Sequence, residues 1–172
     1  YQMICYEFQK IEEDFGKKNK QKAKYFERNS WKKSKFKNEG GGTYSIIKDG
    51  LVFDSLGVNF SKVSGKFQNK FKSQILGAKK NPNYWASGIS IVAHMKNPKI
   101  PAMHFNTRFI VTSKNWFGGG MDATPCIVDN NETKLFHKKI KLMCNRHNKN
   151  YYPKYKKWCD NYFYLPHRRE KR

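Results

Sequence analysis

Two segments near the middle of the chain alternate apolar and polar residues, as half-buried strands do. They span residues 86–95 and 102–112, and the connection between them contains Pro98 and Pro101. Because side chains along a strand point to alternate faces, the pattern predicts an antiparallel hairpin with one apolar and one polar face. The apolar face is expected to carry Ile89, Ile91, Ala93, Phe105, Phe109 and Val111.

Helical spacing of apolar residues appears at both ends of the chain. The first helix is predicted over residues 1–15, where Ile4, Phe8, Ile11 and Phe15 form one stripe. A second is predicted from Glu132 to His147, capped by Asp129, Asn130 or Asn131 and burying Phe136, Ile140 and Met143. A third is predicted to start at Pro153 and run to Leu165, with a stripe of Tyr155, Trp158, Tyr162 and Leu165.

Glycine and charged residues separate these elements. Strands are predicted over residues 43–64, with Asp49-Gly50 as a hairpin turn. We expect a basic linker up to Lys37, loops at the glycine runs 40–42 and 118–120, and a loop or short helix at 66–83. The elements together predict one α+β domain.

The charge of the chain narrows the classes of function. The 172 residues carry a formal net charge of +22, which suggests an anionic partner. However, 29 Lys outnumber 6 Arg and are spread along the chain, whereas specific nucleic-acid binders rely on Arg. No apolar run is long enough for a transmembrane helix, and no secretory signal is visible. The four cysteines form no C-x-x-C pair, so we expect reduced thiols.

The polar face of the central hairpin concentrates the candidate chemistry. A symmetric register, in which paired residue numbers sum to 198, sets His94 opposite His104. Any even sum leaves Ser90, His94, His104, Asn106 and Arg108 on one face. An arginine in mid-strand suits a carboxylate or phosphate, and a histidine moves a proton near neutral pH or binds a metal. Spacing alone does not separate these roles from ordinary structural hydrogen bonding.

At these residues the chain resembles the oxygen-dependent coproporphyrinogen-III oxidases of heme biosynthesis. The motifs that carry the resemblance include His-Phe-Asn-Thr-Arg at 104–108 and Trp-Phe-Gly-Gly-Gly-Met-Asp-Ala-Thr-Pro at 116–125. Further matching stretches lie, in family order, at 40–42, 57–61, 86–90, 94–98 and 152–163. The resemblance implies a large, rather flat, mostly antiparallel sheet flanked by helices on both faces, working as a cytoplasmic homodimer.

The resemblance also implies an activity. This is the oxidative decarboxylation of two propionates of coproporphyrinogen III to vinyl groups, giving protoporphyrinogen IX, with molecular oxygen as co-substrate and no organic cofactor. By the resemblance, Ser90, Asn106, Thr107 and Arg108 bind substrate and His104 is the proton donor. His94, His104, His137 and His167 match histidines assigned to a divalent, manganese-like metal in bacterial members. No membrane or nucleic-acid partner is expected.

Family members continue beyond residue 172 with a Gly-rich segment and a Phe-Phe-Asp-Asp stretch. The resemblance therefore implies that residues 1–172 form a single truncated domain, with little oxidase activity alone. Two other classes stay open at the level of sequence. One is a metal hydrolase that uses His94, His104 and His137, with Asp122 as the nearest carboxylate candidate. The other is a basic nucleic-acid-binding module.

Overall fold

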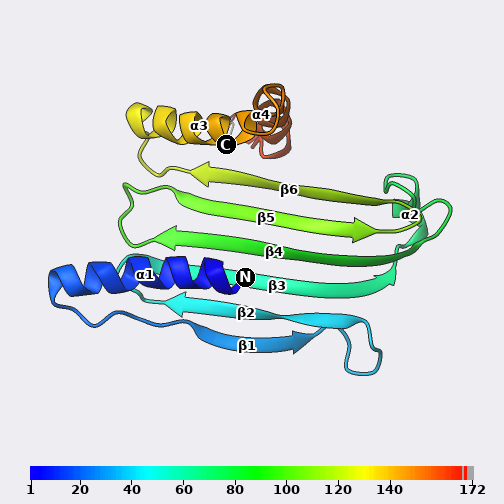
Figure 1. Ribbon diagram of the computed structural model, residues 1–172, viewed down its shortest axis with the longest axis horizontal. Coiled ribbons are helices and arrows are strands. Elements are labelled where there is room, and N and C mark those ends of the chain that lie inside the picture. The colour runs from blue at the N-terminus through cyan, green and yellow to red at the C-terminus, as the bar shows by residue number, and fades with distance from the viewer. Residues whose placement is uncertain (168, 170–172) are drawn as a thin grey trace.

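The fold is a six-stranded antiparallel sheet with helices at both ends of the chain (Figure 1). The structure, a computed structural model, describes residues 1–167 and 169, without the side chain of Phe71. The elements are α1 (Gln2–Asn19), β1 (Glu27–Lys32), β2 (Gly40–Lys48), β3 (Phe53–Lys66), α2 (Asn69–Lys72), β4 (Asn83–Met95), β5 (Ala102–Val111), β6 (Asn115–Thr124), α3 (Asn130–Asn145) and α4 (Tyr151–Tyr162). The strands are neighbours in sequence order, which confirms the predicted α+β class with an antiparallel sheet.

One face of the sheet, here called the core face, packs against α1. The buried core residues on this face come from the three neighbouring strands β2, β3 and β4: Ile47, Phe53, Leu56, Val58, Ile91 and Ala93. Phe8 of α1 meets Phe53 edge to face, with ring centroids 5.4 Å apart. The apolar stripe predicted for this helix is confirmed for Ile4 and Phe8, whose burial drives the contact, but wrong for Ile11 and Phe15, which are exposed.

A buried carboxylate fixes α1 to the turn between β2 and β3. The side chain of Glu12 is 0% exposed and accepts hydrogen bonds from the backbone N–H groups of residues 51, 52 and 53, each at 2.8 Å. A Cβ on Gly50 would lie 2.5 Å from Glu12 Oε1, so only glycine fits there. Asp49 has a φ of +51°, which suits the predicted Asp-Gly turn.

Three local predictions are wrong. The glycine runs 40–42 and 118–120 belong to strands β2 and β6, not to loops. The basic linker contains a strand, β1, which pairs with β2. A pleated strand tolerates glycine, and glycine hides the period-two pattern because it has no side chain.

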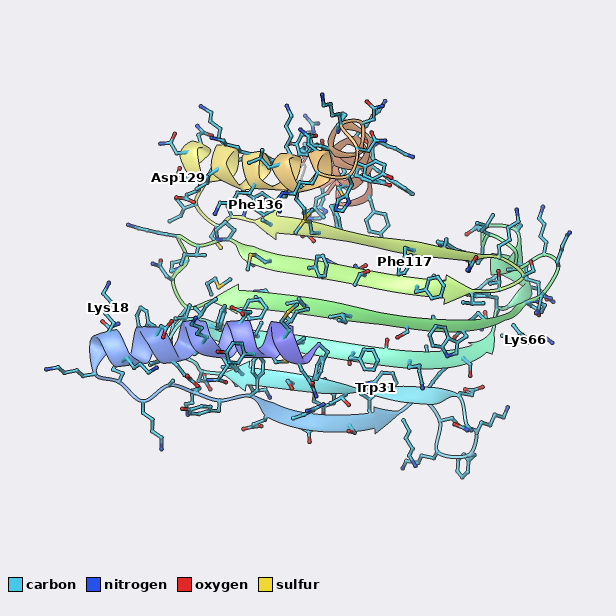
Figure 2. All side chains as sticks on the ribbon, in the orientation of Figure 1. Lys18, Trp31, Lys66, Phe117, Asp129 and Phe136 are labelled. Atoms are coloured by element: carbon cyan, nitrogen blue, oxygen red, sulfur yellow. The ribbon has the colours of Figure 1, made fainter. Side chains whose placement is uncertain are left out.

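The helices α3 and α4 form the other end of the molecule. Asp129 caps α3, because its Oδ1 accepts from the backbone N–H groups of Asn131 and Glu132 at 2.8 and 3.1 Å. Figure 2 shows Asp129 at the start of α3 and Phe136 between α3 and β6. Met143, predicted to be buried, is exposed, and α4 begins two residues before Pro153. Neither helix contains a fully buried residue.

None of the helices in the described part of the chain is long and apolar enough to cross a membrane.

Candidate active site

The face opposite the core face, here called the polar face, presents polar side chains in rows across the strands. In the first row Gly57, Val92, His104 and Asp122 are neighbours. In the second row Asn59, Ser90, Asn106 and Gly120 are neighbours. In the third row Ser61, Gly88, Arg108 and Gly118 are neighbours. Because directly paired residues project to the same side of a sheet, all three rows lie on one face.

His104 is held by a carboxylate on the adjacent strand. Its Nδ1 lies 2.9 Å from Oδ1 of Asp122, whose side chain is only 8% exposed. Its Nε2 lies 3.4 Å from Nδ2 of Asn106. A carboxylate accepts and does not donate when ionised, so Asp122 favours a proton on Nδ1 and leaves Nε2 as the acceptor of the ring. His104 can therefore take up or release a proton at Nε2.

Arg108 stands on the polar face between two glycines. Gly88 on β4 and Gly118 on β6 are its direct neighbours across the strands. A Cβ added to Gly118 would meet nothing within 4 Å, so the space beside Arg108 is open. Arg108 is exposed and has no hydrogen bond or ion pair within the described chain. Its guanidinium is therefore available for an anionic group of a ligand.

Aromatic residues border the polar groups on two sides. The ring of Phe163, just after α4, lies edge to face with His104 at 6.1 Å between centroids. It also contacts the position where a Cβ of Gly120 would be, at 3.5 Å. Toward the other edge of the sheet, Trp31 Nε1 donates to Asn59 Oδ1 at 3.1 Å. The site thus combines a flat polar floor with aromatic borders, which suits a broad ligand with several charged groups.

The predicted sharing of one face by His94 and His104 is confirmed, although the register differs. The pairs across β4 and β5 have numbers that sum to 196, so His104 lies opposite Val92 and His94 lies two residues further along β4. An even sum preserves the face, as the alternation requires. Ser90, Asn106 and Arg108 also lie on the polar face as expected.

Thr107, by contrast, pairs with Ile89 and projects to the core face. Its side chain therefore lies on the opposite face from His104, and only its backbone is accessible to a ligand on the polar face.

The four histidines expected to bind a metal lie in different places. His137 lies between α3 and α4, with its Nδ1 3.1 Å from the hydroxyl of Tyr152. Burial, together with the charge of Lys156, lowers the pKa of His137 below its usual value. His94 and His167 are exposed. Within residues 1–167 and 169, no three His, Cys, Asp or Glu side chains gather to hold a metal ion, so these residues do not fit the expected centre.

Sequence reasoning missed several residues of this site. Asp122 was considered only as a metal-side carboxylate, and Trp31, Asn59 and Phe163 were not assigned to it. The sequence did contain a signal for Asp122. If residues 115–124 are treated as a strand with alternating faces, Asp122 lies beside His104. Trp31 and Phe163 reach the site through tertiary packing, which one sequence does not reveal.

Comparison with known proteins defines the class to which this fold and site belong. The family model for coproporphyrinogen III oxidase matches residues 1–172. The chain therefore belongs to the coproporphyrinogen III oxidase family.

The most similar proteins found include rickettsial enzymes. The chain is 50% identical over 170 residues to the oxygen-dependent coproporphyrinogen-III oxidase of Rickettsia bellii strain RML369-C, and 49% identical to that of Rickettsia africae. These matches cover 99% of this chain and 60% of each relative. The chain thus spans about three fifths of the length of these relatives. Neither alternative class, the metal hydrolase or the nucleic-acid module, finds support in the comparisons.

Proposed function

We propose that the polar face binds coproporphyrinogen III and takes part in its oxygen-dependent decarboxylation to protoporphyrinogen IX. The observation that carries the proposal is the alignment of His104, supported by Asp122, with an unpaired Arg108 on one glycine-bordered face. Membership of the family and the printed names of the relatives point to the same substrate and to molecular oxygen.

Charge and shape of the face match the substrate. A coproporphyrinogen carries four propionates, so a carboxylate near Arg108 forms a charge-assisted pair worth about 1.5–3 kcal/mol. The donors of Ser90 and Asn106 lie one row away, within reach of the same group or of a pyrrole. Open positions at Gly57 and Gly118, where a Cβ would meet nothing within 4 Å, let the macrocycle approach the sheet backbone.

The reaction requires proton transfer near the reacting propionate. Each of the two reacting propionates becomes a vinyl group by loss of carbon dioxide and of a hydride from the carbon next to the ring. Oxygen takes up the hydride and a proton and is reduced to hydrogen peroxide. His104 presents Nε2 to the ligand, because Asp122 occupies Nδ1 at 2.9 Å. It can accept a pyrrole N–H proton or donate a proton to reduced oxygen. Asp122 orients the ring and fixes which ring nitrogen faces the ligand.

The family resemblance also supports a cytoplasmic homodimer, which we include in the proposal.

The test is an oxidase assay of the protein and its variants. Coproporphyrinogen III is prepared anaerobically and added first, and oxygen is then admitted. Product is followed as protoporphyrin fluorescence after oxidation. Arg108→Ala should weaken substrate binding about tenfold or more. Asp122→Asn should lower turnover and change the pH profile, with little change in KM, because it affects the proton carrier and not the anion site. Lys79→Gln, in the exposed loop before β4, is the matched control. Unchanged binding in Arg108→Ala would contradict the proposed site.

A further inference from the structure

A second concave site lies at the far corner of the sheet, outside the candidate active site. It is an open pocket of about 540 Å³ where β1 turns into β2, and its floor is the glycine run 40–42. The β1–β2 connection extends beyond the edge of the sheet in Figure 1. Phe60, which lines the pocket, also contacts Tyr1 at 6.3 Å between ring centroids. The pocket therefore opens on the core face, on the opposite side of the sheet from His104.

The lining of this pocket carries charge of one sign. Lys32, Lys35, Lys37 and Lys62 contribute to it, and no Asp or Glu does. None of these four ammonium groups has a hydrogen bond or an ion pair within the described residues, and all four side chains are exposed. The nearby carboxylate of Glu39 is already paired with Lys33, at 3.6 Å. Four cations around one cavity repel each other, so a bound anion relieves that repulsion.

The spacing of two of these lysines indicates what kind of anion fits. Lys32 and Lys62 both pair with Gly41, one on each side, so they share a face across two strand spacings. Neighbouring strands are about 4.8 Å apart, which places the Cα atoms of the two lysines about 9.5 Å apart. Gly41 places no side chain between them, and the β1 backbone approaches it closely, since a Cβ there would lie 2.1 Å from the carbonyl oxygen of Trp31. A ligand with two anionic groups can bridge the pair, whereas one monovalent ion engages only one lysine well.

The pocket also has aromatic residues that can contact an apolar part of a ligand. Phe36 is 96% exposed and lines the same pocket as Phe60. Covering a water-exposed phenyl ring with a ligand removes apolar surface from water, which makes binding more favourable. We propose that this pocket binds a small polyanion, with at least two phosphate or carboxylate groups on the lysines and a flat apolar body against the phenylalanines. Trp31 lines this pocket and also borders the polar face, but the pocket does not contain His104, Arg108 or Asp122 and does not depend on the oxidase proposal.

Isothermal titration of the chain with inorganic pyrophosphate and with citrate tests the anion requirement and separates phosphate from carboxylate recognition. We expect saturable, one-to-one binding of at least one of the two, weakened by added salt. Lys32→Gln combined with Lys62→Gln should weaken it at least fivefold. The control pair Lys79→Gln with Lys80→Gln removes the same charge from an exposed loop remote in sequence. It should change the affinity less than twofold.

Equal weakening by the two pairs would mean attraction by net charge alone and would overturn the proposal, as would absence of saturable binding to either anion. Lys35→Gln, in the connection outside the sheet, repeats the test if the strand variant fails to fold. ATP, which adds a flat ring to a polyphosphate, should bind more tightly than pyrophosphate. Phe36→Ala should abolish that advantage without affecting pyrophosphate. ATP binding no tighter than pyrophosphate would overturn the apolar part of the assignment.

Discussion

The two ends of the sheet differ in how they are covered. The part formed by β2, β3 and β4 has α1 packed on it and contains the buried core around Leu56. The part formed by β5 and β6 has no fully buried residue, and neither do α3 and α4. Phe117 of β6 is 78% exposed, and Figure 2 shows its side chain over the outer strands. Trp158 of α4 is 64% exposed.

The strands that are covered by α1 contribute most of the buried core, whereas β5 and β6 carry most of the candidate catalytic and binding side chains. His104, Asn106, Arg108 and Asp122 all lie on β5 and β6, and Ser90 lies on the strand next to them. A site that admits a large ligand must leave groups uncovered, so it contributes little burial to the folded state. The α1 end supplies the burial and holds the strands in register. Substitutions in the two regions should therefore have very different effects on unfolding.

The largest effect is expected from removing core volume. Leu56 is fully buried against α1, so Leu56→Ala should lower the free energy of unfolding by about 3 kcal/mol, through lost transfer energy and a cavity. Leu142→Ala removes the same atoms from a half-exposed position on α3 and should cost about 0.5 kcal/mol or less. Urea titration followed by circular dichroism measures both. Equal losses would remove the contrast between the two ends.

The buried carboxylate gives the next largest effect. Glu12→Gln preserves the shape of the side chain but replaces one acceptor oxygen with an amide donor, facing N–H groups that are also donors. We expect a loss of about 2 kcal/mol, the usual value for hydrogen bonds to a charged group. Glu7→Gln, on the exposed side of the same helix, is the control and should be nearly neutral. A neutral Glu12→Gln would show that the turn amides find other partners.

The cap of α3 should have a smaller and local effect. Asp129→Ala removes the acceptor for two backbone N–H groups at the start of the helix and should cost about 1 kcal/mol. Faster hydrogen exchange at the amides of Asn131 and Glu132 is the direct measurement. Lys134→Ala, in the exposed interior of α3, should leave those amides unaffected. Faster exchange that extends to β3 would indicate that the two ends unfold together.

The smallest expected effect is a pH dependence of the contact between α3 and α4. The folded state lowers the pKa of His137 through burial and Lys156, so the unfolded chain binds the proton more readily. The contact is therefore fully stabilised above about pH 6.5 and weakens as the pH falls through the folded-state pKa. An NMR titration of the His137 ring should give the lowered pKa. The acid-induced loss of Tyr152 contacts should disappear in His137→Gln but persist in His147→Gln.

Elements with a regular spacing of apolar and polar residues could be predicted from the sequence, whereas elements without such a spacing could not. The central hairpin, the Asp49-Gly50 turn and three helices follow directly from apolar spacing, and all are present. β1 was missed because its residues are mostly exposed and polar, so no period marks it. β6 was missed because three consecutive glycines interrupt its pattern.

The same reasons explain the site. His104, Ser90, Asn106 and Arg108 were placed on one face by parity alone, which does not depend on the register. Asp122 required β6 to be recognised as a strand. The predicted partner of each residue was wrong by two residues, because the observed pairs sum to 196 and the connection between β4 and β5 is not centred on Lys99. Contacts between distant elements, such as Phe163 over His104, depend on packing that no local pattern encodes.

The contact of Glu12 with the β2–β3 turn also has a consequence for the order in which the chain folds. The partners are 39–41 residues apart in sequence, and the helix is synthesised first. Until the turn emerges, the carboxylate is solvated, and its burial becomes favourable only when the three amides arrive. We therefore expect α1, β2 and β3 to fold as one early unit, before the strands that carry His104 and Arg108 exist. Pulse-labelled hydrogen exchange during refolding should protect the amides of residues 51–53 together with α1 and ahead of β5. The N-terminal helix then acts as an internal template on which the later, ligand-facing strands are added one after another.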